Sequence, residues 1–194
     1  MAGTVLLAHG AGADKDHPFM LSLESLFEQA GLTVVRFNFP YMERRKSDGV
    51  KRPPDRMPAL EQAFLEQIES LQLEEGEPLY LAGKSMGGRV ATHILAQSPA
   101  KACLVFGYPF HPLRKPEKLR TAHLEDIAKP VYIFQGARDG MGSREEVLEY
   151  ALSSSVNLHW LEDGDHDLSP RKRSGYSQEE HLATVGNLIK GIIG

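Results

Sequence analysis

The fold of this chain is decided by residues 78–91, Pro-Leu-Tyr-Leu-Ala-Gly-Lys-Ser-Met-Gly-Gly-Arg-Val-Ala. An apolar run from Leu79 to Ala82 has the length of a buried strand, and apolar residues recur at helical spacing from Val90 onward. Between strand and helix lies Gly-Lys-Ser-Met-Gly at 83–87, a G-x-S-x-G pattern. On a strand-turn-helix this pattern forms a nucleophile elbow, a sharp turn that exposes the serine hydroxyl above the sheet edge. The stretch therefore predicts an α/β fold in which Ser85 is a nucleophile.

The turn at Ser85 needs glycine two residues before it and two residues after it. A bend this sharp crowds both positions, and Gly83 and Gly87 have no Cβ to clash. A P-loop ending in Gly-Lys-Ser would need glycine at position 78, where the chain has Pro78. We therefore favour the elbow.

Length, composition and charge bound the class of protein. A chain of 194 residues fits a single domain spanning 1–194. The net charge of -4 and the pI of about 6.1 argue against nucleic acid as the main partner. Cys103 is the one cysteine and lies in an apolar run, so we expect a core thiol and no disulfide. With no signal peptide and no apolar run of about 18 residues, we expect a cytoplasmic protein without a membrane partner. The oligomeric state stays open.

Short apolar and β-rich runs alternate with helical patterns along the chain. The predicted strands are 4–8, 32–39, 79–82, 102–106, 131–135 and 156–161. The predicted helices begin near 16, 58, 86, 143 and 177, the last two at capping boxes. We expect long connections at 41–56 and 107–129, the second with one irregular helical turn.

This alternation predicts a three-layer α/β/α sandwich with a mainly parallel six-stranded sheet. Right-handed crossovers bring the carboxyl ends of all strands to one edge. Binding sites of such sheets lie outside that edge, where the strand order reverses. The loops after strands one, three, five and six should therefore meet at one site.

A serine nucleophile needs a base and an acid that orients the base. His166 follows the sixth strand in a Gly-Asp-His-Asp loop at the correct edge, and we predict it as the base. Asp139 follows the fifth strand and is the predicted acid, because Asp126 precedes that strand at the opposite edge. The other histidines fall within helices and strands, at a helix start, or in the long connection, where structural or surface roles fit better. Ser85, Asp139 and His166 are thus the predicted catalytic residues.

Acyl transfer also needs hydrogen-bond donors for the developing oxyanion. We expect one from the amide of Met86, directly after the nucleophile. The second should come from the His-Gly-Ala-Gly loop at 9–12, through the amide of Ala11 or, failing that, of Gly12.

Together these motifs resemble a small, lidless α/β-hydrolase of the branch related to dienelactone hydrolases. The matching stretches are His-Gly-Ala-Gly at 9–12, Gly-Lys-Ser-Met-Gly at 83–87, Gly-Ala-Arg-Asp at 136–139 and Gly-Asp-His at 164–166. The resemblance implies a reduced core that lacks the family's first two strands. It also implies cleavage of an ester, thioester or amide through an acyl-enzyme, and we expect a small ester or thioester as substrate. Because dienelactone hydrolases use Cys where this chain has Ser85, their lactone chemistry does not transfer.

Without room for a lid domain, residues 41–56 and 107–129 should form the walls of the cleft. Tyr41, Tyr108 and Phe110 are predicted substrate contacts, although packing against their own strands would explain them equally well. The basic residues of 41–56 either attract an anionic substrate or form an ordinary solvated face. We expect no cofactor and no metal ion. The alternative function is a catalytically silent module of this fold that binds another protein.

Overall fold

The computed structural model describes residues 3–194, and in this range six strands form a single parallel sheet. The strand order is β2-β1-β3-β4-β5-β6. Their bounds are β1 (Thr4–Ala8), β2 (Thr33–Phe37), β3 (Leu79–Lys84), β4 (Ala102–Phe106), β5 (Val131–Gly136) and β6 (Val156–Leu161). The predicted sheet is confirmed, and each predicted strand is found within two residues of its expected limits.

The helices are α1 (Pro18–Gln29), α2 (Pro40–Asp48), α3 (Met57–Ser70), α4 (Met86–Ile94), α5 (Arg144–Val147) and, after the last strand, α6 (Gln178–Ile193). The described part of the chain also contains three short 3-10 turns: η1 (Leu95–Gln97), η2 (Ala122–Leu124) and η3 (Lys172–Ser174). The second of these is the irregular turn predicted within 107–129. Both predicted capping boxes are present, with the hydroxyls of Ser143 and Ser177 at the starts of α5 and α6.

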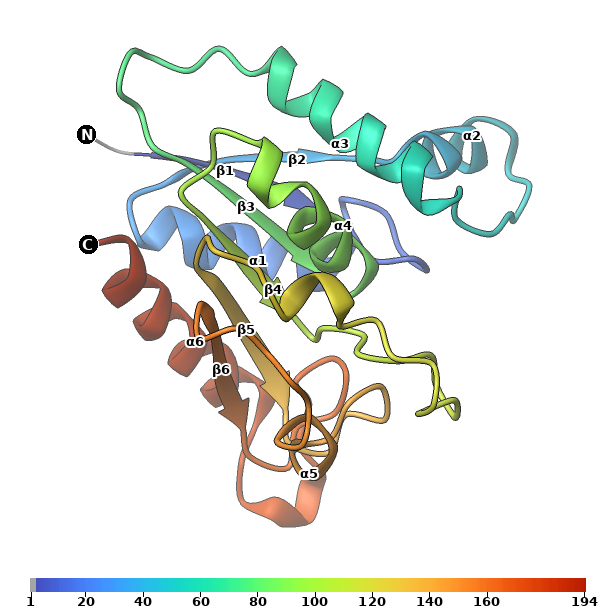
Figure 1. Ribbon diagram of the computed structural model, residues 1–194, viewed down its shortest axis with the longest axis vertical. Helices are drawn as coiled ribbons and strands as arrows, with labels where there is room; N and C mark the ends of the chain where they lie inside the picture. The colour runs from blue at the N-terminus through green and yellow to red at the C-terminus, as the bar shows by residue number, and fades with distance from the viewer. Residues whose placement is uncertain (1–2) are drawn as a thin grey trace.

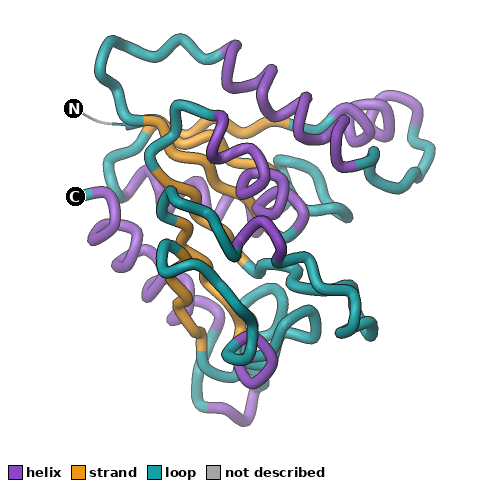
Figure 2. Tube along the Cα trace, viewed as in Figure 1, coloured by secondary structure: helices purple, strands orange, loops and turns teal. Residues whose placement is uncertain are grey.

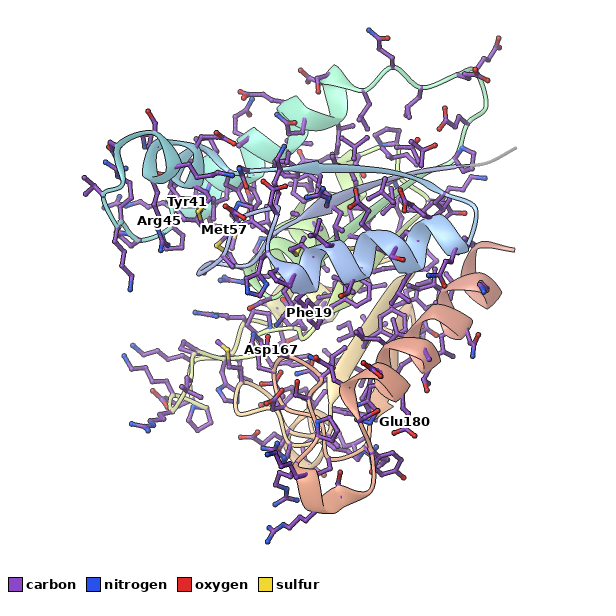
Figure 3. The ribbon with its side chains drawn as sticks, turned by 180° about the vertical axis from the view of Figure 1, so that it is seen from behind. Phe19, Tyr41, Arg45, Met57, Asp167 and Glu180 are labelled. Carbon is purple, nitrogen blue, oxygen red and sulfur yellow. The ribbon has the colours of Figure 1, made fainter. Side chains whose placement is uncertain are left out.

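Helices cover both faces of the sheet, which confirms the three-layer arrangement. In Figure 1, α3 and α4 lie on the near face, while α1 and α6 lie on the far face, which Figure 3 turns toward the viewer. The strands alternate between two apolar cores: Leu6 and Leu81 point to the core under α3 and α4, whereas Leu7 and Ala82 point to the core under α1 and α6. Because both faces are buried, the strands are nearly continuous apolar runs.

The strand order reverses beside β1, where β1 pairs with β2 on one side and with β3 on the other. In register, Ala8 lies next to Gly83, so the loop after β1 and the elbow after β3 leave the sheet side by side. This is the switch point where open parallel sheets bind ligands. The long connection after β4 leaves the same edge and extends well away from the sheet (Figure 2).

Two predicted segments differ in the structure. Residues 41–56 are not a loop throughout, because α2 occupies the first part; Pro40 starts it, and Gly49 ends it with a φ of 72°. Its polar sequence concealed the helix, which is anchored by only two buried residues, Tyr41 and Met42. The helix expected from Ser143 to about residue 152 is a single turn, because after Val147 the backbone tightens into i→i+3 bonds.

Candidate active site

Ser85 lies on a strained turn between β3 and α4. Its backbone has φ 51° and ψ -115°, a conformation that costs a non-glycine residue about 1–3 kcal/mol. A Cβ on Gly83 would lie 2.3 Å from the carbonyl carbon of Gly87, and one on Gly87 would lie 2.5 Å from the carbonyl oxygen of His9. Both predicted glycine requirements are therefore confirmed, and the neighbouring chains hold Ser85 in place.

The structure brings the three predicted catalytic side chains into one hydrogen-bonded row. The Nε2 atom of His166 is 2.8 Å from the Oγ of Ser85, and its Nδ1 atom is 2.7 Å from the Oδ2 of Asp139. With the Nδ1 proton donated to the carboxylate, Nε2 is left to accept the proton of the serine hydroxyl. Asp139 is fully buried, whereas the side chain of His166 is 28% exposed. The arrangement can deprotonate a serine in contact with solvent.

The carboxylate of Asp139 is held by groups that the sequence reasoning missed. Its Oδ2 atom accepts a hydrogen bond from the side-chain amide of Gln135 at 2.9 Å, and its Oδ1 atom accepts one from the backbone amide of Met141 at 2.8 Å. Gln135 also bonds both backbone groups of Tyr108, at 2.7 and 3.2 Å. The sequence did contain a signal for this contact, namely a glutamine near the end of a buried apolar strand. A buried side-chain amide needs hydrogen-bond partners, and Asp139 is close by in the chain.

The loop after β6 crosses the ends of two other strands to bring His166 to Ser85. A Cβ on Gly136 would lie 2.1 Å from the carbonyl oxygen of Asp165, and one on Gly107 would lie 2.5 Å from that of His166. Gly107 also has a φ of 66°. Only glycine at these strand ends lets the loop pass this closely.

Lys84 joins the elbow to the same loop. Its ammonium donates a hydrogen bond to the carbonyl oxygen of His166 at 2.7 Å and lies 3.1 Å from a carboxylate oxygen of Asp167. It also lies over the ring of Phe19, 5.6 Å from the ring centre. Burial lowers the pKa of Lys84, and the charge of Asp167 partly offsets that shift. The buried side chain of Lys84 therefore helps to fix the loop that carries His166.

The amides expected to bind an oxyanion have no acceptor within the described part of the chain, residues 3–194. Those of Met86, Ala11 and Gly12 donate no hydrogen bond there. Met86 and Ala11 both line a cavity that contains Ser85. Free amides at the start of a helix and beside it are suited to stabilising negative charge.

Two buried rings, those of His9 and Tyr41, make hydrogen bonds that hold the loop after β1. His9 accepts a hydrogen bond from the backbone amide of Phe39 at 3.0 Å through Nε2, and its Nδ1 atom is 2.6 Å from the carbonyl oxygen of Gly10. The hydroxyl of Tyr41 donates to the carbonyl oxygen of Ala11 at 2.9 Å. Burial lowers the pKa of His9, which keeps the ring neutral and able to accept from Phe39.

Two cavities meet at Ser85. The first has a volume of about 340 Å³, and its lining includes Met86, Arg89 and Arg120 besides the serine. The second, of about 360 Å³, is lined by His166 and Lys84 together with residues of the loop after β1. Phe19 and Asp167, labelled in Figure 3, line this second cavity from different elements. A substrate bound at Ser85 can therefore extend to either side.

The three predicted substrate contacts are not on the cavity walls. Tyr41, Tyr108 and Phe110 are each 0% exposed and belong to the apolar core under α3 and α4. Tyr41 supports the loop after β1, and the hydroxyl of Tyr108 donates to the carbonyl oxygen of Arg120 at 2.8 Å. The prediction is therefore corrected: these large rings pack inside the apolar core, and none of them is part of the lining of the two cavities at Ser85.

Three of the six basic residues in 41–56 form ion pairs. Arg44 pairs with Asp55 at 2.6 Å, Arg52 pairs with Asp48 at 2.7 Å, and Lys46 lies 3.2 Å from both Asp14 and Asp16. These pairs neutralise part of the charge that the segment could otherwise offer to an anionic substrate. Within residues 3–194, no helix has the length and apolar character needed to cross a membrane.

Comparison with known proteins assigns the family. The model described as "Alpha/beta hydrolase domain" matches residues 1–194. The chain belongs to the alpha/beta hydrolase family. This membership supports hydrolysis as the class of activity.

Solved structures agree with this α/β-hydrolase fold. An alpha-beta serine hydrolase homologue from Coxiella burnetii is 18% identical, with a TM-score of 0.73 over 100% of this chain and 86% of that one. A serine hydrolase without a lid from Xanthomonas campestris is 17% identical, with a TM-score of 0.68 over 98% and 81%. Dienelactone hydrolase from Anabaena variabilis is 21% identical, with a TM-score of 0.66 over 98% and 84%. At these sequence identities, the similarity shows only that this chain has the same fold as each of these proteins.

Proposed function

We propose that this α/β-hydrolase is a serine hydrolase that cleaves a small carboxylic ester or thioester through an acyl-enzyme. The observation that supports it best is the unbroken row from Ser85 through His166 to Asp139, with hydrogen bonds of 2.8 and 2.7 Å. A hydroxyl, an imidazole and a buried carboxylate in this order form the constellation of acyl-transfer enzymes.

In the proposed reaction, the Oγ of Ser85 attacks the acyl carbon while its proton moves to Nε2 of His166. The oxyanion that forms accepts hydrogen bonds from the amides of Met86 and Ala11. Collapse of this intermediate breaks the bond to the leaving oxygen or sulfur, which takes the proton from His166. Water then attacks the acyl-serine by the same route, releasing the acid and restoring the hydroxyl of Ser85.

A fluorophosphonate probe tests the nucleophile directly. We expect it to label the wild-type protein and to leave Ser85→Ala unlabelled, whereas Ser22→Ala, which removes an exposed hydroxyl on α1, should be labelled like the wild type. Absence of labelling in wild-type protein with an intact circular dichroism spectrum would instead support the silent protein-binding module.

The acid has its own test. Asp139→Asn should lower kcat for p-nitrophenyl esters about 10³- to 10⁴-fold, because an amide in this position favours the wrong tautomer of His166. Asp126→Asn is the matched control, since that exposed residue lies at the other edge of the sheet, before β5. A small effect of Asp139→Asn would reassign the acid.

A further inference from the structure

Two arginines line the first cavity, which also contains the carboxylate of Asp55. Arg89 comes from α4 and Arg120 from the long connection after β4, and both line the cavity that contains Ser85. Among residues 3–194, neither side chain forms an ion pair within 4.0 Å or donates a hydrogen bond. The Nε atom of Arg89 is buried and has no partner. A buried guanidinium donor without an acceptor is costly unless a ligand completes it.

The backbone holds both arginines at the cavity. The amide of Arg89 donates to the carbonyl oxygen of Ser85 at 3.0 Å, so this side chain starts one helical turn beyond the nucleophile. Arg120 is fixed on both sides, because its amide donates to the carbonyl oxygen of Phe110 at 2.8 Å and its own carbonyl oxygen accepts from Tyr108. Burial and the nearby charge of Arg89 lower the pKa of Arg120. Two like charges are thus kept together against their repulsion.

The surroundings favour an anionic group joined to a short apolar chain. Met57, Leu60, Pro109 and Met141 supply apolar parts of the wall of this cavity. Asp55 also lines the cavity, but it is already paired with Arg44 at 2.6 Å. Guanidinium groups match the planar geometry of a carboxylate, to which they bind through two parallel hydrogen bonds.

The position of His166 indicates which half of the substrate reaches the arginines. The protonated imidazole must donate to the leaving oxygen or sulfur, so the leaving group lies on the side of His166. His166 lines the second cavity and is not part of the lining of the first. The acyl half of the substrate therefore extends into the first cavity, toward Arg89 and Arg120.

Building on the proposed serine-hydrolase function, we propose that Arg89 and Arg120 bind a carboxylate at the far end of the acyl chain. The substrate class is then the half-esters or half-thioesters of short dicarboxylic acids. Hydrolysis of the ester adds water across the acyl-oxygen bond and releases the dicarboxylate and the alcohol.

The test compares three ester series at pH 7.5, in which only the position of the charge changes. The first contains monomethyl esters of dicarboxylic acids with four to eight carbons, and the second contains methyl esters of monocarboxylic acids of matching length. The third contains acetyl esters of ω-hydroxy acids, which place the same carboxylate on the leaving group. We expect wild-type kcat/KM to be at least about tenfold higher for the best half-ester than for its neutral partner and its reversed partner.

The variants assign this preference to the two arginines. Arg89→Met and Arg120→Met should each lower the ratio of kcat/KM for the half-ester to that for the neutral ester about ten- to hundredfold, since a charged hydrogen bond is lost while volume is kept. Arg45→Met is the matched control. Arg45, labelled in Figure 3, has no ion pair in residues 3–194 and lies outside the first cavity, so its ratio should stay within about twofold of wild type.

Fluorophosphonate labelling of the same variants separates the two levels of the proposal. Labelled wild-type protein that shows no preference for half-esters, or a preference unaffected by both Met variants, would overturn the carboxylate subsite and leave the serine hydrolase standing. A preference for the reversed esters would overturn the assignment of the acyl side. Failure of wild-type protein to label would remove the proposed function and this inference together. If Arg89→Met disturbs the elbow and lowers labelling, Arg120→Met alone decides the outcome.

Discussion

In this hydrolase, hydrogen bonds from neighbouring groups hold the residues of the candidate site in place. The carboxylate of Asp139 takes part in three hydrogen bonds, with His166, Gln135 and the amide of Met141. Tyr41 similarly controls the loop after β1 through a hydrogen bond to a carbonyl oxygen. Such supporting contacts determine how precisely a site is preorganised.

Tyr41→Phe tests this support. The substitution keeps the buried ring and removes the hydrogen bond of 2.9 Å to the carbonyl oxygen of Ala11. We expect kcat to fall roughly fivefold, because a hydrogen bond of about 1 kcal/mol no longer aims the amide of Ala11. Steady-state kinetics and thermal unfolding should be measured together. Tyr132→Phe is the control, because Tyr132 lies on β5 in the core away from the elbow. A lower Tm of Tyr41→Phe with unchanged kcat would limit Tyr41 to packing.

Secondary-structure elements approach each other closely at their glycines. The end of β3 contacts the first turn of α4 so tightly that Gly83 has the carbonyl carbon of Gly87 and the amide of Gly88 at 2.3 Å from any added Cβ. The packing of α4 against β3 and β4 therefore depends on the absence of a Cβ at Gly83 and Gly88 as well as on apolar contacts.

Gly83→Ala should lower the free energy of unfolding by about 3 kcal/mol or more, since backbone atoms must move to admit the methyl group. Gly191→Ala on α6 is the matched control, because a Cβ there meets nothing within 4 Å. It should raise the free energy of unfolding by about 0.5 kcal/mol through better helix propensity. Urea unfolding measures both changes. Equal effects of the two substitutions would contradict the close approach at the elbow.

A pair of histidines joins α3, α4 and η2. The rings of His93 and His123 lie 3.8 Å apart, and His123 shares a hydrogen bond of 2.9 Å with the hydroxyl of Thr92. The Nδ1 atom of His93 is 3.0 Å from a carboxylate oxygen of Glu61. Burial lowers the pKa of both imidazoles, and that of His123 falls to about 3, with further contributions from His93 and Arg89.

This pair predicts a loss of stability in mild acid. Between pH 6.5 and about 3, the unfolded chain binds a proton at His123 that the folded chain does not, so the free energy of unfolding rises with pH across that window. We expect it to fall by about 1–2 kcal/mol from pH 7 to pH 5, after allowing for partial exposure of the ring. Urea titrations of the wild type and His123→Gln measure the change. A slope that His123→Gln does not reduce would contradict this assignment.

The whole molecule is organised around one sheet that separates two apolar cores. Alternate residues of each strand enter opposite cores, as Leu6 and Leu7 do in β1. Lys84 and the glycines at the ends of β4 and β5 then connect the last part of the chain to the elbow. Neither core can form without the strands that also build the other.

We therefore predict that residues 1–194 unfold as one domain. Differential scanning calorimetry should give a single transition in which the calorimetric and van't Hoff enthalpies agree. Two resolved transitions would show that the part of the chain after β4 folds separately. A ligand for the first cavity should raise this single Tm, because binding to the folded state alone shifts the equilibrium.

Local sequence determined the strands, the elbow and the three residues that meet in the site. Apolar runs, glycine spacing and chain order were sufficient for Ser85, Asp139 and His166, because parallel strands bring their carboxyl ends to one edge whatever the details of packing. The capping boxes at Ser143 and Ser177 were equally readable, since their hydrogen bonds join residues three apart.

Tertiary structure alone decided which rings face the substrate and which charges remain unpaired. Tyr41, Tyr108 and Phe110 have the composition of a binding surface, but the core buries them. The same holds for charge: Arg44, Lys46 and Arg52 have carboxylate partners, whereas Arg89 and Arg120 come from distant segments and line one cavity without an ion pair among residues 3–194. Burial and charge pairing depend on contacts between residues far apart in the chain. Local sequence patterns do not specify those contacts, so they become known only from the tertiary structure.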